Sequence, residues 1–270
     1  MDKPASDNSA IYDARRGTWR HHLINAFHSE EQLLEVRLPD RYDPARRYPV
    51  VYLLPCEAGE DCQFGDPMLE VMNLSPTLRE QCIFARPSFD TIPWYAHHVD
   101  DPRIVHDAYL RTVVIPWVEQ HYATTTTAGR LLLGFSKSGW GAFSLLARYP
   151  DFFTAAASWD APLFMDIDCF GAYGTARHFG APAHFVRFRP PALLQANPAP
   201  FQRRPRLVLA GQQVFGSEAM PPGAGSCHTA AMHEFLQQID IPHHYHNDLV
   251  FPHAWHAGWM EPLLRALLCV

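Results

Sequence analysis

The sequence predicts an α/β domain in which helices cover both faces of a mostly parallel central sheet. Short apolar runs typical of buried strands recur along the chain, at residues 48–55, 82–89, 130–135, 153–159 and 206–211. Stretches with helical periodicity lie between and after these runs, at residues 107–121, 139–148, 229–239 and 259–268. Strands that alternate with helices are the pattern of βαβ units, whose strands run parallel.

Length and composition favour a single domain over residues 1–270. The chain has 270 residues, of which 47% are hydrophobic and 19% charged, enough to build a large core. Its net charge is -6 and its longest basic run is only "RFR", so a nucleic acid is not expected as a partner. No apolar run approaches the ~20 residues of a membrane span, so no membrane is expected either. The sequence leaves the oligomeric state open, and a homo-oligomer is possible.

The polar start of the chain and its cysteines favour a cytoplasmic protein. Residues 1–20 show no apolar core and no cleavage site of a secretory leader, and we expect a flexible segment there. The six cysteines have no zinc-binding spacing, so we expect free thiols, no metal and no cofactor. They are Cys56, Cys62, Cys82, Cys169, Cys227 and Cys269.

Two stretches depart from the alternation of strands and helices. Residues 22–29 and 33–39 are expected to form an antiparallel pair of strands before the parallel sheet. Residues 161–204, rich in Pro, Phe, Ala and Arg, lie between two predicted strands. We interpret them as a small excursion over the carboxyl edge of the sheet, where ligands bind in such folds.

The run "LLLGFSKSGWGAFSLLARYPDFF", residues 131–153, places a serine between a predicted strand and a predicted helix. This is the pattern of a nucleophile elbow, a tight turn that needs small residues two positions before and after the serine. Gly134 and Ser138 fill these positions around Ser136. Centring the motif on Ser138 instead would put Trp140 at a flank, where it is too large. The pattern therefore predicts Ser136 as the nucleophile.

The same run resembles the α/β-hydrolases of the putative esterase family, of the esterase D type, which include feruloyl esterases and mycolyltransferases. The resemblance rests on Ser136, Gly139, Gly141, Ala142 and "YPDFF", with support from "RRYPVVYLLP" and "PSFDTIPWY". It covers about residues 30–265. It implies the α/β-hydrolase fold and a serine esterase that needs no cofactor or metal and acts on a small-molecule ester.

A serine nucleophile needs a histidine base, which in this fold follows late in the chain. The family often has a tryptophan two residues after this histidine, which selects His253, followed by Trp255. His256 is the alternative.

The acid that orients the histidine is where the sequence departs from the family. Relatives usually place it after the strand that corresponds to residues 206–211, but this loop reads "GQQVFGSEAM" and its only carboxylate is Glu218. Asp160 follows the preceding predicted strand and keeps the order serine, acid, histidine. We expect Asp160 to be the acid, with Glu218 as the alternative.

The oxyanion hole and the substrate pocket can also be assigned to particular residues. The N–H of Lys137 is expected to be one donor, because it follows the nucleophile. The second donor is expected from Cys56 or Glu57, after the strand at 48–55. Trp94 and Tyr95 are expected to line the substrate pocket. Together these residues predict a serine hydrolase with a Ser-His-Asp triad that cleaves carboxylic esters. The alternatives are an acyltransferase that uses the same site and a non-catalytic hydrolase-like binding protein.

Overall fold

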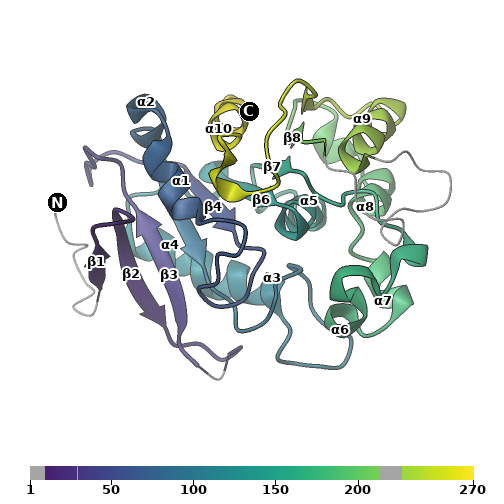
Figure 1. Cartoon of the computed structure of the whole chain (residues 1–270), viewed down its shortest axis with the longest axis horizontal. Helices are drawn as coiled ribbons and strands as arrows, with labels where there is room; N and C mark the ends of the chain where they lie inside the picture. The colour runs from purple at the N-terminus through teal and green to yellow at the C-terminus, as the bar shows by residue number, and fades with distance from the viewer. Residues whose placement is uncertain (1–9, 29, 213–226) are drawn as a thin grey trace.

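The computed structural model describes residues 10–28, 30–212 and 227–270. Within these ranges the strands form one sheet, in the order β1-β2-β3-β5-β4-β6-β7-β8-β9 (Figure 1). The strands are β1 (Ile11–Asp13), β2 (Thr18–Leu23), β3 (Gln32–Arg37), β4 (Val50–Leu54), β5 (Ile83–Pro87), β6 (Arg130–Phe135), β7 (Ala155–Trp159), β8 (Leu207–Ala210) and β9 (His244–His246). The pairs β1–β2, β2–β3 and β3–β5 are antiparallel. The remaining pairs, β5–β4, β4–β6, β6–β7, β7–β8 and β8–β9, are parallel, which confirms the predicted α/β class.

The strand order places a crossover next to β4. The chain passes from β4 to β5 on one side and then returns to β6 on the other side of β4. In open parallel sheets such a reversal leaves a crevice at the carboxyl ends of the strands, where ligands bind. Residues that follow β4, β6 and β7 are therefore placed for a shared site.

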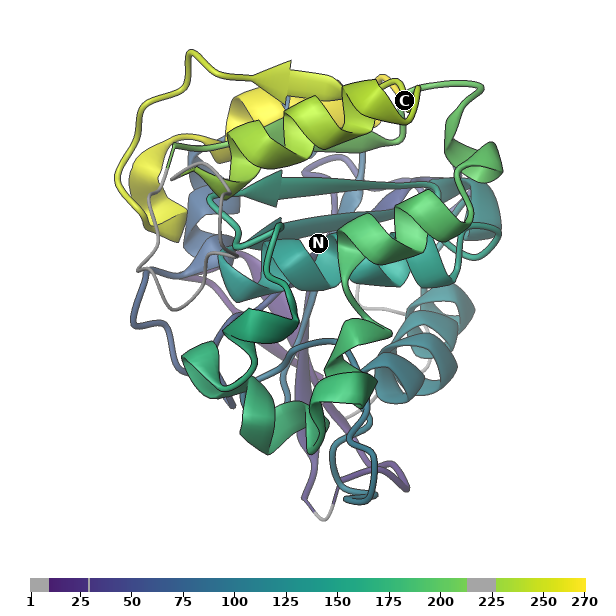
Figure 2. The same cartoon turned by 90° about the vertical axis from the view of Figure 1, so that its right-hand side faces the viewer.

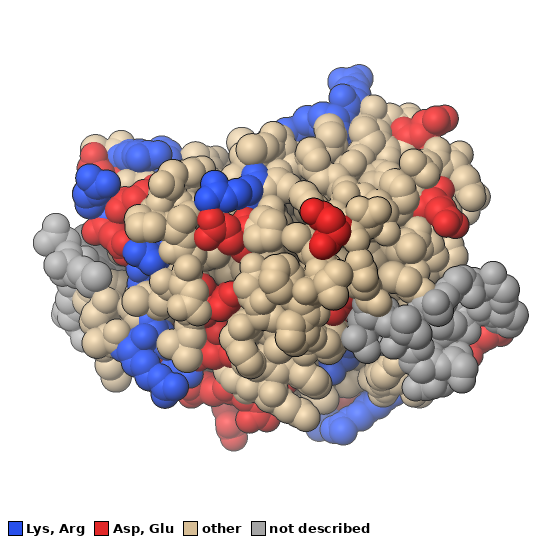
Figure 3. Space-filling view, turned by 45° about the horizontal axis from the view of Figure 1, so that its top comes forward, with Lys and Arg blue, Asp and Glu red and all other residues tan. Residues whose placement is uncertain are grey.

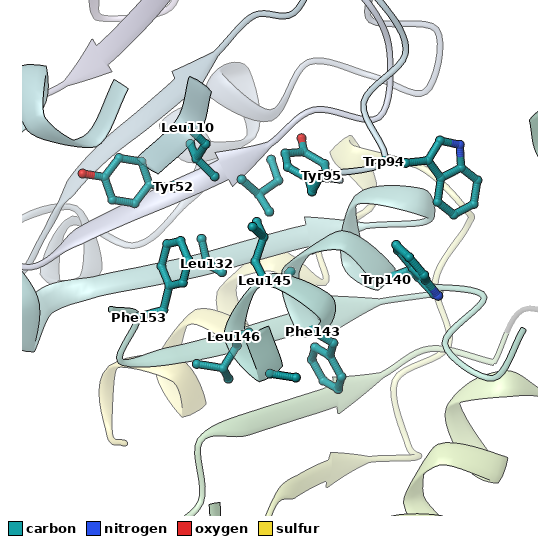
Figure 4. Close-up of a cluster of buried hydrophobic side chains, with 14 of the residues drawn as sticks. Tyr52, Trp94, Tyr95, Leu110, Leu132, Trp140, Phe143, Leu145, Leu146 and Phe153 are labelled. Carbon is teal, nitrogen blue, oxygen red and sulfur yellow. The ribbon is translucent and has the colours of Figure 1, made fainter. Parts of the chain in front are cut away.

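Helices cover both faces of the sheet because the central strands are apolar on both. Val50 and Tyr52 of β4 belong to one buried cluster, and Val51 and Leu53 belong to the other. Helices with buried residues in the first cluster include α3 (His106–Tyr109), α4 (Ile115–His121), α5 (Lys137–Arg148) and α9 (His228–Gln238). Those in the second cluster are α1 (Pro67–Asn73), α2 (Pro76–Arg79) and α10 (Met260–Leu268). Figure 4 shows the first cluster, where side chains of α5 pack on Leu132 of β6.

The predicted helix at 107–121 is continuous in the structure but not regular. A π-helical turn at Leu110–Val114 joins α3 to α4. Pro116 lies just after this turn. A proline lacks the N–H that an α-helix needs, so it breaks regular hydrogen bonding at this point.

The excursion at 161–204 consists of short helices. They are η3 (Ile167–Cys169), η4 (Ala172–Gly174), α6 (Thr175–Phe179), α7 (Pro182–Val186), α8 (Pro190–Ala196) and η5 (Ala199–Phe201). In Figure 2 the segments α6 to α8 lie together beside the sheet. Their aromatic residues are buried, because Phe179 and Phe185 pack against Trp140 of α5.

The start of the chain differs from the prediction in two ways. The expectation of a flexible segment over residues 1–20 is wrong for 11–13 and 18–20, which lie in strands β1 and β2, whereas residues 1–9 lie outside the described part. The strand predicted at 22–29 instead ends at Leu23. The side chain of Asn25 accepts hydrogen bonds from the N–H groups of Phe27 (2.9 Å) and His28 (3.1 Å). Such a bond turns the backbone and ends a strand.

The surface carries charges of both signs. On the face shown in Figure 3, acidic and basic side chains are interspersed. Among the described residues, no helix combines the length and the apolar composition that crossing a membrane requires.

Candidate active site

Ser136 lies on the predicted tight turn, between β6 and α5. Its φ is 52° and its ψ is -128°, a strained conformation for a residue that is not glycine. Gly134 lets the end of β6 approach the start of α5 closely, because a Cβ at position 134 would lie 2.2 Å from the carbonyl oxygen of Ser138. The N–H of Ser136 donates to the carbonyl of Trp159 at 2.9 Å, which ties the turn to the end of β7. The absence of a side chain at position 134 is thus a steric requirement.

Ser138 has a structural place in the same turn. Its side chain is fully buried, and its hydroxyl donates to the carbonyl of Phe135 at 2.8 Å and accepts from the N–H of Phe135 at 2.9 Å. Ser136 is half-buried and therefore reaches the surface. Of the two serines, only Ser136 is positioned to meet a substrate.

Asp160 and His253 meet at the carboxyl edge of the sheet. Asp160 directly follows β7, has a φ of 44°, and its side chain is buried. Its Oδ2 lies 3.2 Å from Nδ1 of His253, which is on the loop between β9 and α10. The backbone of Gly211 packs tightly against the other carboxylate oxygen, since a Cβ at position 211 would lie 2.1 Å from Oδ1 of Asp160. The structure thus brings together the two residues that sequence reasoning paired.

Aromatic side chains hold the His253 ring. Its centroid lies 4.4 Å from that of Phe135 and 5.9 Å from that of Phe64. The loop is anchored next to it, because the N–H of Trp255 donates to the carbonyl of Phe64 at 2.7 Å. Sequence reasoning missed both phenylalanines, although Phe135 stands inside the elbow motif itself.

His256, the alternative base, faces a different segment. It is exposed, and its ring packs against the loop that contains Gly65, where a Cβ would lie 2.1 Å from Nδ1 of His256. The geometry therefore favours His253.

The loop after β8, the family's usual place for the acid, falls only partly in the described chain. Glu218 lies outside the described residues. Gln212 is described, and its Nε2 donates to the carbonyl of Asn247 at 2.6 Å, so this side chain ties the loop to the chain after β9.

The start of α5 and the loop after β4 form the expected oxyanion region. Lys137 is the first residue of α5, so its N–H has no acceptor within the helix. Cys56 is buried, and its thiol donates to Oε2 of Glu57 at 3.1 Å. Burial raises the pKa of this thiol, which therefore stays protonated. Oε1 of Glu57 accepts from the N–H of Phe64 at 3.2 Å, so Glu57 links this loop to the residues around His253.

The prediction that Trp94 and Tyr95 line the substrate pocket is wrong for this structure. Both side chains are fully buried in the core beside α5 (Figure 4). The Tyr95 ring packs on Gly141, and its hydroxyl donates to the carbonyl of Pro55 at 2.6 Å. Tyr95 therefore anchors the loop after β4, in which the second oxyanion donor is expected.

In the part of the chain that is described, no three His, Cys, Asp or Glu side chains are grouped so that they could hold a metal ion. All six cysteines are free thiols, as expected.

A family model matches this region of the chain. Residues 98–212 match the family described as "Putative esterase". The match includes Ser136 and Asp160 and ends before His253. It agrees with the resemblance that the elbow motif indicated.

A curated relative extends the comparison. Esterase Rv1288 of Mycobacterium tuberculosis is 31% identical over 141 residues, which are 50% of this chain and 30% of the relative. The matched region thus spans less than a third of that longer protein. The family match and this relative support the prediction of an ester hydrolase.

Solved structures share the fold over nearly the whole chain. An S-formylglutathione hydrolase from Agrobacterium tumefaciens is 13% identical, with a TM-score of 0.69 over 97% of this chain and 96% of the other. The fluorophosphonate-binding serine hydrolase FphF of Staphylococcus aureus is 14% identical, with a TM-score of 0.68 over 93% of this chain and 96% of the other. The chain therefore has the α/β-hydrolase fold.

Proposed function

We propose that this chain is a serine esterase that cleaves a carboxylic ester through an acyl-enzyme on Ser136. The observation that carries the proposal is the contact between Asp160 and His253 at the same edge of the sheet as the strained Ser136 turn. A serine, a histidine and a buried carboxylate, on segments that follow different strands of one sheet, are the parts of a charge-assisted acyl-transfer site.

The first half of the reaction forms the acyl-enzyme. The hydroxyl oxygen of Ser136 attacks the ester carbonyl, and its proton passes to Nε2 of His253, because Nδ1 is engaged by Asp160. The Asp160 carboxylate stabilises the resulting imidazolium. The N–H of Lys137, at the positive end of α5, donates to the developing oxyanion, with a second N–H from Cys56 or Glu57. The alcohol then leaves with the proton from His253.

The second half releases the acid. Water attacks the acyl-enzyme and gives a proton to His253. The tetrahedral intermediate then collapses, and the oxygen of Ser136 leaves as it takes this proton back from His253, which releases the acid and restores the hydroxyl. FphF, which has the same fold, is a fluorophosphonate-binding serine hydrolase, and this is in keeping with the proposed chemistry.

The test compares the two serines of the elbow. With p-nitrophenyl butyrate as substrate, Ser136→Ala should lower kcat by a factor on the order of 10⁶, the cost of losing the serine of a subtilisin triad. Ser138→Ala is the matched control and should keep most of the activity, because its hydroxyl bonds only within the turn. Equal losses from both variants would refute the nucleophile assignment. An inactive wild-type chain would favour a binding protein.

A further inference from the structure

Lysine is rare in this chain, and one of its two lysines adjoins the nucleophile. Among 22 basic residues only Lys3 and Lys137 are lysines, and Lys3 lies outside the described residues. Every other basic position carries an arginine. The presence of a lysine directly after Ser136 therefore needs a separate explanation.

Helix geometry gives no such explanation. Lys137 is the first residue of α5, and the first turn of this helix contains no acidic residue. The amino end of a helix carries a partial positive charge, so a cation is disfavoured there and an anion is favoured. The position thus adds the charge of a lysine to a site that is already electropositive.

An internal ion pair does not account for Lys137 either. Its ammonium makes no salt bridge with any described carboxylate. The nearby carboxylate of Glu57 is used elsewhere, since its two oxygens bind the Cys56 thiol and the Phe64 N–H. Lys137 is half-buried, so part of its hydration is already lost.

Lys137 starts α5 where the excursion packs on this helix, because Phe179, the residue after His178, lies 5.9 Å from Trp140 of α5 between ring centroids. Its charge acts on the Cys56 thiol, which follows β4, and on the imidazole of His178, which belongs to α6. Burial, followed by the charges of Arg177 and Lys137, lowers the pKa of His178 to about 4. The lysine therefore lies where the excursion approaches Ser136.

His178 adds a buried polar group without a partner. Its side chain is 4% exposed, and its Nδ1 makes no hydrogen bond. A buried polar atom without a partner is costly unless a ligand or water satisfies it. Next to it, 6.3 Å away between ring centroids, is His106, whose Nδ1 also has no partner. Neutral imidazoles can each donate one N–H to a bound group.

We propose that Lys137, together with His178 of α6, binds an anionic group of the substrate, so that the site selects esters that carry a carboxylate near the scissile bond. This inference rests on the proposed esterase function. The amino end of α5, the unpaired ammonium and the unpartnered imidazole nitrogen all favour the same kind of ligand. Lys137 is on this account a specificity residue, in addition to the role of its backbone N–H.

The experiment uses two matched pairs of esters. One pair carries the anion on the acyl side: the p-nitrophenyl monoester of glutaric acid and its methyl ester. The other carries it on the alcohol side: 4-butyryloxybenzoic acid and its methyl ester. The readout is the ratio of kcat/KM for the acid to kcat/KM for the methyl ester. Lys137→Gln should lower this ratio about tenfold or more in one pair, the worth of a charge-assisted hydrogen bond, and Lys137→Arg should restore most of it.

Arg41→Gln is the control, because it removes the same charge at an exposed position on the loop after β3, at the opposite edge of the sheet. The inference is overturned if Lys137→Gln leaves the ratio unchanged in both pairs, or if Arg41→Gln lowers it as much. In either case, continued hydrolysis of the methyl esters would leave the esterase proposal standing. Binding is measured separately as the rise in melting temperature that glutarate causes in Ser136→Ala. Loss of this rise on adding Lys137→Gln supports the inference, and an unaltered rise contradicts it.

Discussion

Replacing Asp160 with asparagine isolates the contribution of its charge to the reaction. The Oδ2 of Asp160 contacts Nδ1 of His253 at 3.2 Å, and the carboxylate is only 3% exposed, so its field is little screened by water. Asparagine keeps the volume but lacks the charge that stabilises the imidazolium, and it favours the wrong tautomer. In a serine-protease triad this change costs about 10⁴ in kcat, and we expect a loss of about 10³–10⁴ here. That loss corresponds to about 4–5.5 kcal/mol of transition-state stabilisation.

The fold should tolerate this substitution. The backbone N–H of Asp160 still donates to the carbonyl of Ala210, and asparagine accepts the positive φ of 44°. Urea unfolding should therefore show a small change in stability while p-nitrophenyl butyrate hydrolysis collapses. Asp168→Asn, which removes the same charge from an exposed side chain of the excursion, should leave kcat unchanged. Full activity of Asp160→Asn together with an inactive Glu218→Gln would place the acid after β8 and refute the reasoning.

Two further predictions follow from the histidines. His253→Ala should lower kcat by about 10³ or more, whereas His256→Ala, whose ring faces Gly65, should change it little; the reverse order, in the same assay, would exchange their roles. Burial lowers the pKa of His106 to about 3, whereas a histidine in the unfolded chain has a pKa near 6.5. Between pH 3 and pH 6.5, therefore, the imidazole of residue 106 is protonated in the unfolded chain and neutral in the folded one. The resulting stability is complete above pH 6.5 and is lost as the pH falls toward 3. From pH 7.5 to pH 5.0 the free energy of unfolding should fall by about 2 kcal/mol through this group. Urea unfolding curves at the two pH values should show this fall in the wild type but not in His106→Asn. An equal fall in both proteins would contradict the assignment.

Local requirements explain what could be predicted from the sequence. The elbow was predictable because its turn excludes side chains at Gly134, a constraint visible as spacing in the chain. Strands β4 to β8 were predictable because they are buried on both faces and read as short apolar runs. The start of α1 also has a local signal in the sequence, the cap Asp66 followed by Pro67.

Contacts between distant parts of the chain explain what could not be predicted. Phe64 meets His253 only because the loops after β4 and β9 fold against each other, and no local pattern encodes this contact. Trp94 and Tyr95 follow β5 in sequence, as pocket residues would, yet the packing of α5 and the excursion buries them. The choice of Asp160 over the later loop depended on chain order, and the contact with His253 required the folded structure.

The central claim is that Ser136 forms the covalent intermediate, and adduct mapping tests it most directly. The wild-type chain is treated with a fluorophosphonate, digested, and its peptides are analysed by mass spectrometry. The account predicts one adduct, on Ser136 in the peptide that contains residues 131–148. The adduct should be absent from Ser136→Ala and still present in Ser138→Ala. A wild-type chain that stays unlabelled, or an adduct on any other residue, would contradict it.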